Sequence, residues 1–509
     1  MAIQDLPSNT GDNQSPPANI DLENVDAQHT SSYVIAKLKR EEIVFVLRAP
    51  EEADGGFLIY SLSEGSTPDD GKPFSLDVVQ CQQQQLPDEL SEFLVDRDSL
   101  PPSHLRLPRP VHVVVSTGSG LRRAQEFYEG VLRPLLGAAG LAPRESEVGE
   151  GYQVMMTKNA NTVRDFAREL GRDKDAGEKT VILLSGDGGV VDLLNELDHT
   201  SSSSSDASPS PSPTIALLPL GTGNALFHSL HKPHYTSPSS SPTPSSPLVL
   251  GLRTLFKGTA APLPTFRASF SPGAKLISAP VNDPAAEHIT TTERKDHEKK
   301  EGSPPPPPVI THLLGAIVAS YGFHASLVWE SDTPAYRVHG DKRFGMAAAE
   351  LLKMSHAYDA RVEVRRGGGG DFVSLAPHRS QNGDDEQKSV DVRGGGRFNY
   401  VLTTLVSNLE KTFTISPASR PLDGQLRLVH FGDVSGDKTM EIMMGAYREG
   451  EHVQMKEVGY EEVDEVRVTI AEEDARWRKV CVDGSIVELE RGGWMSVTKE
   501  GRERLRVLV

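Results

Sequence analysis

Cysteine is scarce in this sequence of 509 residues, which contains only Cys81 and Cys481. Two cysteines cannot build a disulfide framework, so the chain fits a reducing compartment and we expect a cytoplasmic protein. Positive charge is also in deficit, because 53 Lys and Arg face 71 Asp and Glu, for a net charge of -18. Such a chain repels polyphosphate backbones, so nucleic acid is not an expected partner.

Long hydrophobic runs are missing as well. Residues 313–319 form one of the longest, and a membrane-spanning helix needs roughly 18 to 20 apolar residues. The polar, acidic residues 1–24 lack the basic and apolar regions of a secretory signal. We therefore expect any membrane contact to be peripheral, on intracellular membranes, and the sequence gives no indication of oligomeric state.

The length predicts two or three domains with tails and insertions. Residues 1–32 are rich in Asn, Asp, Ser and Pro and are expected to be a disordered tail. Residues 33–108, with apolar runs at 43–47 and 57–60, are expected to be a small β-rich module. Charged, Pro-rich and Gly-rich stretches predict disordered insertions near 271–308 and 365–397.

Residues 109–250 show the alternation typical of an α/β domain with a parallel sheet. Short apolar runs predict buried strands, and amphipathic segments predict helices that each bury one face. The expected strands are residues 111–115, 154–157, 181–184 and 215–218, and the expected helices are residues 122–136 and 161–170.

Residues 251–509 are expected to form an antiparallel β-sandwich domain. After residue 401 the pattern predicts strands only, joined by Gly and Asp turns. The expected strands are residues 412–415, 426–431, 466–470, 480–482 and 505–509. A cleft between the α/β domain and this domain is the natural place for a ligand.

Three glycine-rich turns follow strands of the α/β region, at residues 118–120, 186–189 and 221–224. Each precedes a helix, whose first N–H groups are unpaired and attract anions, so three adjacent turns predict a phosphate-binding rim. For the turn at 118–120 alone, a purely structural role is an equal alternative. The Gly-x-x-x-x-Gly-Lys-Ser/Thr loop of common nucleotide sites is absent.

Asp187 lies among the glycines of the second turn. A carboxylate beside a phosphate site is unfavourable unless it takes a proton from an attacking hydroxyl or holds a metal ion that neutralises the phosphates. The alternative is that Asp187 caps the helix that begins near residue 190. The residue alone does not decide between these roles.

The order of three motifs carries a resemblance to a known family. Ser185-Gly-Asp-Gly188, then Asn195-Glu-Leu197, then Pro219-Leu-Gly-Thr-Gly-Asn224 resemble the Gly-Gly-Asp-Gly, Asn-Gly-Leu and Pro-x-Gly-[Ser/Thr]-Gly-Asn motifs of the catalytic domain shared by diacylglycerol, ceramide and sphingosine kinases. Ser185 and the Asn224-Ala225 pair are closer to the sphingoid-base and ceramide kinase branch. The resemblance implies an ATP-dependent lipid kinase that uses Mg²⁺ and acts on a lipid at a membrane surface.

The resemblance also implies roles for individual residues. Asp187 would be the catalytic base, and Asp187 with Asp192 would hold the metal. Ser185, Asp187, Ser326, Val328 and Glu330 would bind the lipid. The nucleotide would be bound by Ser116, Gly118, Ser119, Gly120, Thr157, Asn161, Gly186, Gly188, Asp192, Gly221, Thr222, Gly223, Asn224, Arg337, Arg343, Asp483 and Gly484.

Some of these residues have simpler interpretations. Arg337 and Arg343 could be solvated arginines in a loop. Asp483-Gly484 has the sequence of a two-residue hairpin turn.

Departures from the family motifs leave other functions open. Ser116-Thr117 stands where Asn-Pro is usual, Glu196 replaces Gly, Ser485 replaces Glu, and Val328 falls where sphingosine kinases have an acidic residue. A ceramide or diacylglycerol kinase, or a catalytically dead protein that binds lipid or nucleotide, are therefore alternatives. An NAD kinase is another, favoured by Asn195-Glu196 but opposed by the third turn.

Overall fold

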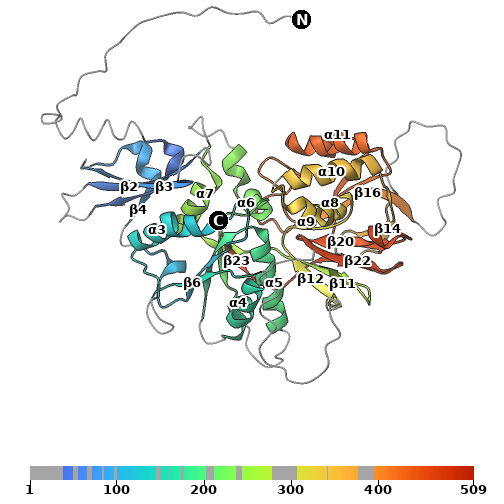
Figure 1. Ribbon diagram of the computed structural model, residues 1–509, viewed down its shortest axis with the longest axis horizontal. Coiled ribbons are helices and arrows are strands. Elements are labelled where there is room, and N and C mark those ends of the chain that lie inside the picture. Colours follow the sequence, from blue (N-terminus) through green and yellow to red (C-terminus); the bar gives the residue numbers. More distant parts are fainter. Residues whose placement is uncertain are drawn as a thin grey trace, which may run out of the picture.

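The computed structural model describes thirteen stretches of the chain: residues 38–49, 56–65, 72–82, 85–96, 100–144, 151–159, 161–173, 177–201, 211–236, 244–277, 307–340, 342–376 and 395–509. The expected tail and most of the two expected insertions lie outside these residues. The described residues form an elongated molecule with three parts in a row, a small sheet, an α/β part and a large sheet (Figure 1). In the described part of the chain, no helix is both long enough and apolar enough to cross a membrane.

The small sheet has the strand order β3-β2-β1-β4. Its strands are β1 (Ile43–Arg48), β2 (Phe57–Glu64), β3 (Phe74–Cys81) and β4 (Leu94–Val95). The sheet lies against α7 (Pro247–Lys257), and Phe45 of β1 contacts the ring of Phe256 at a centroid distance of 4.9 Å. The predicted apolar runs at 43–47 and 57–60 are thus its two central strands.

The parallel sheet predicted for the α/β domain is confirmed, with the order β6-β5-β7-β8-β23-β9. Its strands are β5 (Val111–Val115), β6 (Gln153–Met156), β7 (Thr180–Ser185), β8 (Thr214–Pro219), β9 (Ala260–Pro262) and β23 (Arg506–Leu508). The assignment of residues 505–509 to the C-terminal domain is wrong, because β23 pairs in parallel with β8. Burial of Val507 and Leu508 explains the apolar run, but three residues do not encode which sheet they join.

Helices cover both faces of this sheet. The helices are α2 (Ala124–Phe127), a π-helical turn (Tyr128–Leu132), α3 (Arg133–Ala138), α4 (Thr162–Arg172), α5 (Asp187–Ser201) and α6 (Ala225–Thr236). The first begins two residues later than predicted, because Arg122 has a left-handed φ of 60°. The described residues also form short 3-10 helices at Arg40–Glu42, Asp88–Phe93, Ser103–Leu105, Glu451–Gln454 and Ala475–Trp477.

The large C-terminal sheet is antiparallel, as predicted, and joins 13 strands of the described residues. These are β10 (Phe266–Phe270), β11 (Lys275–Ile277), β12 (His312–Gly315), β13 (Val318–Gly322), β14 (Tyr358–Arg365), β15 (Val373–Ser374), β16 (Gly396–Thr404), β17 (Arg427–Gly432), β18 (Val458–Glu462), β19 (Glu465–Ile470), β20 (Lys479–Val482), β21 (Ser485–Glu488) and β22 (Trp494–Lys499). Parts of the expected insertions are ordered, since β11, β15 and the ends of β14 and β16 fall within them.

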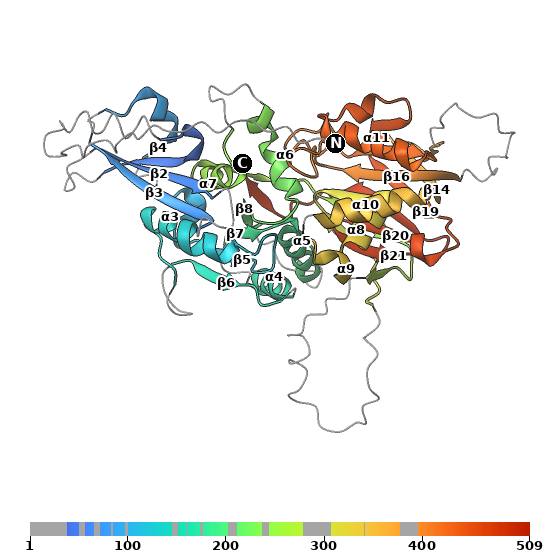
Figure 2. The ribbon, with the colours of Figure 1, turned by 45° about the horizontal axis from the view of Figure 1, so that its top comes forward.

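Four helices accompany this sheet, and Figure 2 shows α10 and α11 beside it: α8 (Phe323–Ser331), α9 (Pro334–Arg337), α10 (Lys342–Met354) and α11 (Gly436–Tyr447). The prediction of strands only after residue 401 is therefore wrong. Ser435 caps α11 by accepting from the Lys438 N–H, and Ile442 and Ala446 are buried one turn apart. The strand predicted at 412–415 is also wrong, since only an isolated bridge between Asn408 and Thr414 forms there.

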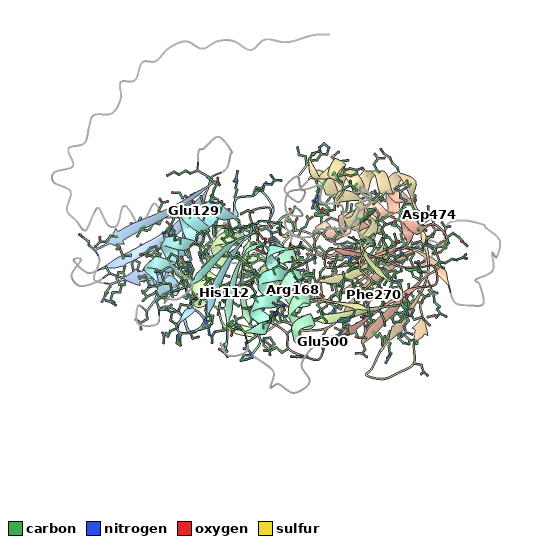
Figure 3. All side chains as sticks on the ribbon, turned by 60° about the horizontal axis from the view of Figure 1, so that its bottom comes forward. His112, Glu129, Arg168, Phe270, Asp474 and Glu500 are labelled. Atoms are coloured by element: carbon green, nitrogen blue, oxygen red, sulfur yellow. The ribbon has the colours of Figure 1, made fainter. Side chains whose placement is uncertain are left out.

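One hydrophobic core connects the α/β part with the large sheet. It runs from Val163 and Leu193, on the α4 and α5 face of the parallel sheet, to Phe266 and Leu314. In Figure 3, Arg168 of α4 lies between His112 of β5 and Phe270 of β10. The glycine turns also approach the C-terminal part, since a Cβ on Gly223 would lie 3.6 Å from the Leu409 carbonyl oxygen.

Candidate active site

The three glycine turns meet at the carboxyl end of the parallel sheet. A Cβ on Gly221 would lie 2.2 Å from the Cα of Gly186, and a Cβ on Gly120 would lie 2.4 Å from the Leu220 carbonyl oxygen. Only glycine allows these approaches, and Gly120 also has a left-handed φ of 51°. The second turn therefore packs on the third, and the first turn also packs on the third.

Other positions of the turns face open space. Gly118 and Gly188 are exposed, and a Cβ on either would meet no atom within 4 Å. Thr222 is exposed, and Gly223 has only the Leu409 carbonyl oxygen within 4 Å of its added Cβ. The packed glycines thus shape a rim, and Gly118 and Gly188 leave room on it for a ligand.

Asp187 joins the second turn to the third. One carboxylate oxygen accepts from the Ala225 N–H at 2.7 Å, and the other accepts from the Leu226 N–H at 3.1 Å. Asp187 therefore does not cap its own helix, which was the alternative considered above, but the N-terminus of α6. Each carboxylate oxygen keeps a further acceptor position, so this contact does not prevent a bond to a substrate hydroxyl.

Asn224 holds the third turn in shape. Its side-chain oxygen accepts from the Gly221 N–H at 3.1 Å, and its amide donates to the Gly221 carbonyl at 2.9 Å. Its φ of 54° is left-handed, a conformation that Asn tolerates better than most residues. Asn224 is buried, and its side chain stabilises the turn through these two bonds.

A second buried carboxylate lies near Asp187. Asp483 accepts from the N–H groups of Ala316 at 2.6 Å, Ile317 at 3.1 Å and Val318 at 2.6 Å. Burial, with a smaller contribution from the negative charge of Asp187, raises the pKa of Asp483 to about 7 against the effect of its three N–H donors. Burial also raises the pKa of Asp187 to about 6, against the effect of its two N–H donors.

The hairpin interpretation of Asp483-Gly484 holds at the same time. The two residues join β20 to β21 with left-handed φ values of 45° and 87°, as a type I′ turn requires. The turn brings Asp483 within electrostatic range of Asp187. Its role toward a nucleotide stays a prediction.

The first turn is tied to the end of β6. Thr117 donates its N–H to the Thr157 hydroxyl oxygen at 3.0 Å and its own hydroxyl to the Thr157 carbonyl at 2.8 Å. Proline, usual at this position in the family, could not donate the first bond. Ser116 is buried and donates its N–H to the Leu184 carbonyl at 3.1 Å. Asn161, four residues after Thr157, begins α4.

Asp192 is one turn along α5 from Asp187. Its carboxylate accepts from Arg164 Nε of α4 at 2.8 Å, and burial raises its pKa. In the described part of the chain, no group of three or more His, Cys, Asp or Glu could hold a metal. Mg²⁺ that arrives with a nucleotide needs only one or two protein carboxylates, and the assignment of Asp187 and Asp192 to this role stays a prediction.

Arg337 and Arg343 converge on a residue that the sequence analysis did not single out, Asp332. Arg337 donates from Nε at 3.0 Å and from a terminal nitrogen at 2.7 Å, and Arg343 donates at 3.0 Å. Two guanidinium groups share one carboxylate, which leaves an excess of one positive charge. Figures 1 and 2 both place α9, which ends at Arg337, at the edge of the C-terminal part that faces α5.

The expected lipid-binding residues of α8 have different surroundings. Ser326 is buried and accepts from the Tyr358 hydroxyl at 2.8 Å. Val328 packs against a small apolar cluster that includes Cys481. Glu330 accepts from Arg476 at 3.2 Å. In the structure, Ser185 lies with the glycine turns, where a Cβ on Gly189 would meet its hydroxyl oxygen at 2.5 Å.

The structure thus gathers the residues of the three turns, with Asp187 and Asp483, in one place. Arg337 and Arg343 form a second group around Asp332, and α8 carries a third. The sequence does not identify Asp332 and Tyr358 as site residues, because their importance depends on the side chains to which they bond. The only indication in the sequence is that Asp332 lies between an acidic residue, Glu330, and a basic residue, Arg337.

Comparison with known families identifies a domain in the α/β part. The diacylglycerol kinase catalytic domain matches residues 110–243. This stretch of the chain belongs to the diacylglycerol kinase catalytic family. The match includes all three glycine turns, Asp187 and Asp192, so the diacylglycerol kinase domain supports a lipid kinase that transfers phosphate from ATP. No curated protein matches the sequence significantly.

Comparison with solved structures gives matches of low identity. A diacylglycerol kinase from Bacillus anthracis str. Sterne has a TM-score of 0.41 and 12% identity, over 79% of this chain and 96% of that chain. A candidate diacylglycerol kinase from the same organism has a TM-score of 0.46 and 12% identity, over 79% of this chain and 95% of that chain. The assignment of residues 110–243 to the diacylglycerol kinase catalytic domain depends on the family match and not on these structures.

Proposed function

We infer that the protein is an ATP-dependent lipid kinase that phosphorylates a hydroxyl of a sphingoid long-chain base or a related lipid. Asp187 is the observation that carries this inference. Its carboxylate lies where the second and third glycine turns meet, and the exposed positions beside it leave room for a ligand. We infer in addition that the protein is cytoplasmic and works at the surface of an intracellular membrane, because its acceptor is a lipid.

The reaction requires positioning and neutralisation of charge more than covalent chemistry. The glycine turns would bind the phosphates of ATP, and Arg337 and Arg343 would add positive charge. Mg²⁺, when bound with the nucleotide, would neutralise the phosphate oxygens. Asp187, with a pKa raised to about 6, is mostly ionised at neutral pH and can take the proton of the acceptor hydroxyl.

The surroundings of α8 favour a second candidate acceptor, a neutral lipid such as ceramide or diacylglycerol. A sphingoid base carries an ammonium group that pairs best with a carboxylate. Ser326 offers a hydroxyl already bonded to Tyr358, Val328 is apolar, and Glu330 is paired with Arg476. The α8 residues therefore provide no unpaired carboxylate for an amine.

The test is transfer of labelled γ-phosphate from ATP and Mg²⁺ to sphingoid bases, ceramide, diacylglycerol and NAD. Wild type is compared with Asp187→Asn and with Asp165→Asn. Asp165 is an exposed residue of α4 that pairs with Arg168 in the same helix. It makes a matched control because it undergoes the same chemical change away from the turns.

Labelling of a lipid by wild type and Asp165→Asn, with loss in a folded Asp187→Asn variant, supports the kinase and its base. The preferred lipid decides between an amine and a neutral acceptor. Labelling of NAD alone would replace the proposal with an NAD kinase. ATP binding without transfer to any acceptor would show a protein that has lost catalysis.

A further inference from the structure

We propose that Asn195 is a positioning residue that fixes the C-terminal sheet against the helix that begins at Asp187, and thereby sets the geometry of phosphoryl transfer. Asn195 lies on α5, about two turns after Asp187. Its side-chain oxygen accepts from the Leu314 N–H at 2.9 Å, and its amide donates to the Leu314 carbonyl at 3.0 Å. The catalytic part of this proposal depends on the proposed function, whereas the structural part does not.

The edge of the large sheet explains why the side chain of Asn195 is needed. Leu314 belongs to β12, the last strand in the order of the large sheet, next to β10. An edge strand presents N–H and C=O groups that require partners when they are buried. Leu314 is fully buried, and the amide of Asn195 supplies one acceptor and one donor, as a neighbouring strand would. A side chain of the α/β part thus completes the edge of the other sheet.

The segment that Asn195 binds is also held by residues of the large sheet. Two residues after Leu314, the N–H groups of Ala316, Ile317 and Val318 all donate to Asp483. The Ile317 carbonyl accepts from the Thr404 hydroxyl at 2.9 Å and from the Leu405 N–H at 3.1 Å. Residues 314–318 are therefore fixed to the large sheet, and Asn195 connects them to α5.

These contacts form a closed path around the site. Asp187 begins α5, Asn195 of the same helix binds Leu314, and the nearby Ala316 binds Asp483, on which the negative charge of Asp187 acts. Loss of the Asn195 contacts would let the large sheet shift relative to α5. A displacement of about 1 Å between reacting groups can lower a rate by about a hundredfold. Binding of ATP would be affected less than the transfer step, because the three glycine turns belong to the α/β part, whereas Arg337 and Arg343 belong to the part that would shift.

The experiment compares wild type with Asn195→Leu, Asn195→Asp and Glu196→Gln. Leu removes both bonds to Leu314, whereas Asp keeps the acceptor and loses the donor. Glu196 is the next residue of α5 but pairs with Arg168 of α4, inside the α/β part. Its substitution therefore alters the same helix without touching the large sheet. Measurements are kcat, the KM for ATP, and hydrogen exchange of the peptide containing residues 312–318.

We expect Asn195→Leu to lower kcat about tenfold or more and to raise the KM for ATP by a smaller factor, and Asn195→Asp to fall between it and wild type. Exchange at 312–318 should increase in both, while Glu196→Gln stays like wild type. Unchanged kcat in folded Asn195→Leu, or unchanged exchange at 312–318, would overturn the proposal. Inactive wild type would instead refute the kinase, and with it the catalytic part of this proposal, while exchange still decides whether Asn195 holds the two parts together.

Discussion

Gly186 and Gly221 approach each other so closely that a Cβ on Gly221 would lie 2.2 Å from the Cα of Gly186 and 2.8 Å from its nitrogen. These atoms are backbone, so they cannot move aside as the end of a side chain could. The contact sets the separation of the second and third turns. It also sets the position of Asp187, which follows Gly186 and binds the first two N–H groups of α6.

Gly221→Ala should therefore destabilise the protein, by an amount in the range of about 1–3 kcal/mol that overpacking typically costs. Nucleotide binding should weaken as the turns separate. Gly188→Ala is the contrasting variant, because its added methyl meets no protein atom within 4 Å. It should leave stability within about 1 kcal/mol of wild type and still weaken ATP binding if the phosphates lie there. Denaturant unfolding and calorimetric titration with ATP measure both effects, and equal stability of the two variants would contradict the packing argument.

Asp332 should control the affinity for ATP through Arg337 and Arg343. Its carboxylate accepts three N–H bonds from the two guanidinium groups and offsets their repulsion. Asp332→Asn removes this charge, so the arginines should separate and the KM for ATP should rise several-fold with little change in kcat. Steady-state kinetics at varied ATP test this. Glu350→Gln, at an exposed pair with Lys353 on α10, is the control. An unchanged or lower KM in Asp332→Asn would show that Asp332 does not prepare the arginines for phosphate.

The stability should rise with pH between about 4 and 6.5 because of buried histidines. Burial lowers the pKa of His112, His228, His231, His324 and His452 to about 4. Between this value and the ordinary value near 6.5, the unfolded chain binds more protons than the folded protein, so folding becomes more favourable as pH rises. Asp187, Asp192, Glu410 and Asp483, whose pKa values burial raises, act in the opposite direction but are fewer than these histidines.

His324→Gln isolates one such group, whose ring nitrogen lies 2.8 Å from the Ser320 hydroxyl. Relative to wild type, its dependence of unfolding free energy on pH should be shallower by up to about 1.4 kcal/mol per pH unit over this interval. Denaturant unfolding at several pH values provides the measurement, with exposed His339→Gln as the control. Parallel curves for wild type and His324→Gln would mean that His324 does not stay neutral in the folded protein.

Local sequence patterns encode many of the strands and helices. They do not encode which of these elements pack together. The strands at 111–115, 181–184 and 215–218 and the helices between them follow from apolar periodicity, and three glycine turns at one sheet edge follow from the parallel order. Periodicity does not reveal that β23 joins β8, or that α11 interrupts the strands after residue 401. Both depend on tertiary packing, which overrides a short apolar run or a methionine-rich segment.

The candidate site divides in the same way. Asp187 is recognisable from its glycine neighbours, because a carboxylate beside a phosphate site is unfavourable unless it takes up a proton or binds a metal ion. Its bonds to Ala225 and Leu226, and the three-way contact at Asp332, join residues that are distant in sequence or not part of any motif. In the sequence, Asn195 is only one residue of the motif at 195–197. The positioning role proposed for it depends on its bonds to Leu314 at the edge of the large sheet, which the sequence does not show.

Arg253 of α7 should hold the small N-terminal sheet on the α/β part. Its guanidinium donates to the carbonyls of Ile43 at 2.8 Å and Arg40 at 2.9 Å, and lies 4.7 Å from the ring centre of Phe93. Burial lowers its pKa to about 10, so it stays charged at neutral pH. Arg253→Ala leaves two carbonyls without this donor, and we expect a loss of about 2–4 kcal/mol in the stability of this contact.

Arg253→Lys should rescue little, because one ammonium group cannot reach two carbonyls in the fixed geometry of a guanidinium. Hydrogen exchange of peptides from β1 and β2 measures the effect, which should be a large increase there and little change in β14. Kinase activity toward the preferred lipid should persist, because Arg253 lies on α7 and contacts neither the glycine turns nor Asp187. Protection of β1 that survives in Arg253→Ala would mean that the apolar contact between Phe45 and Phe256 suffices to hold the sheet.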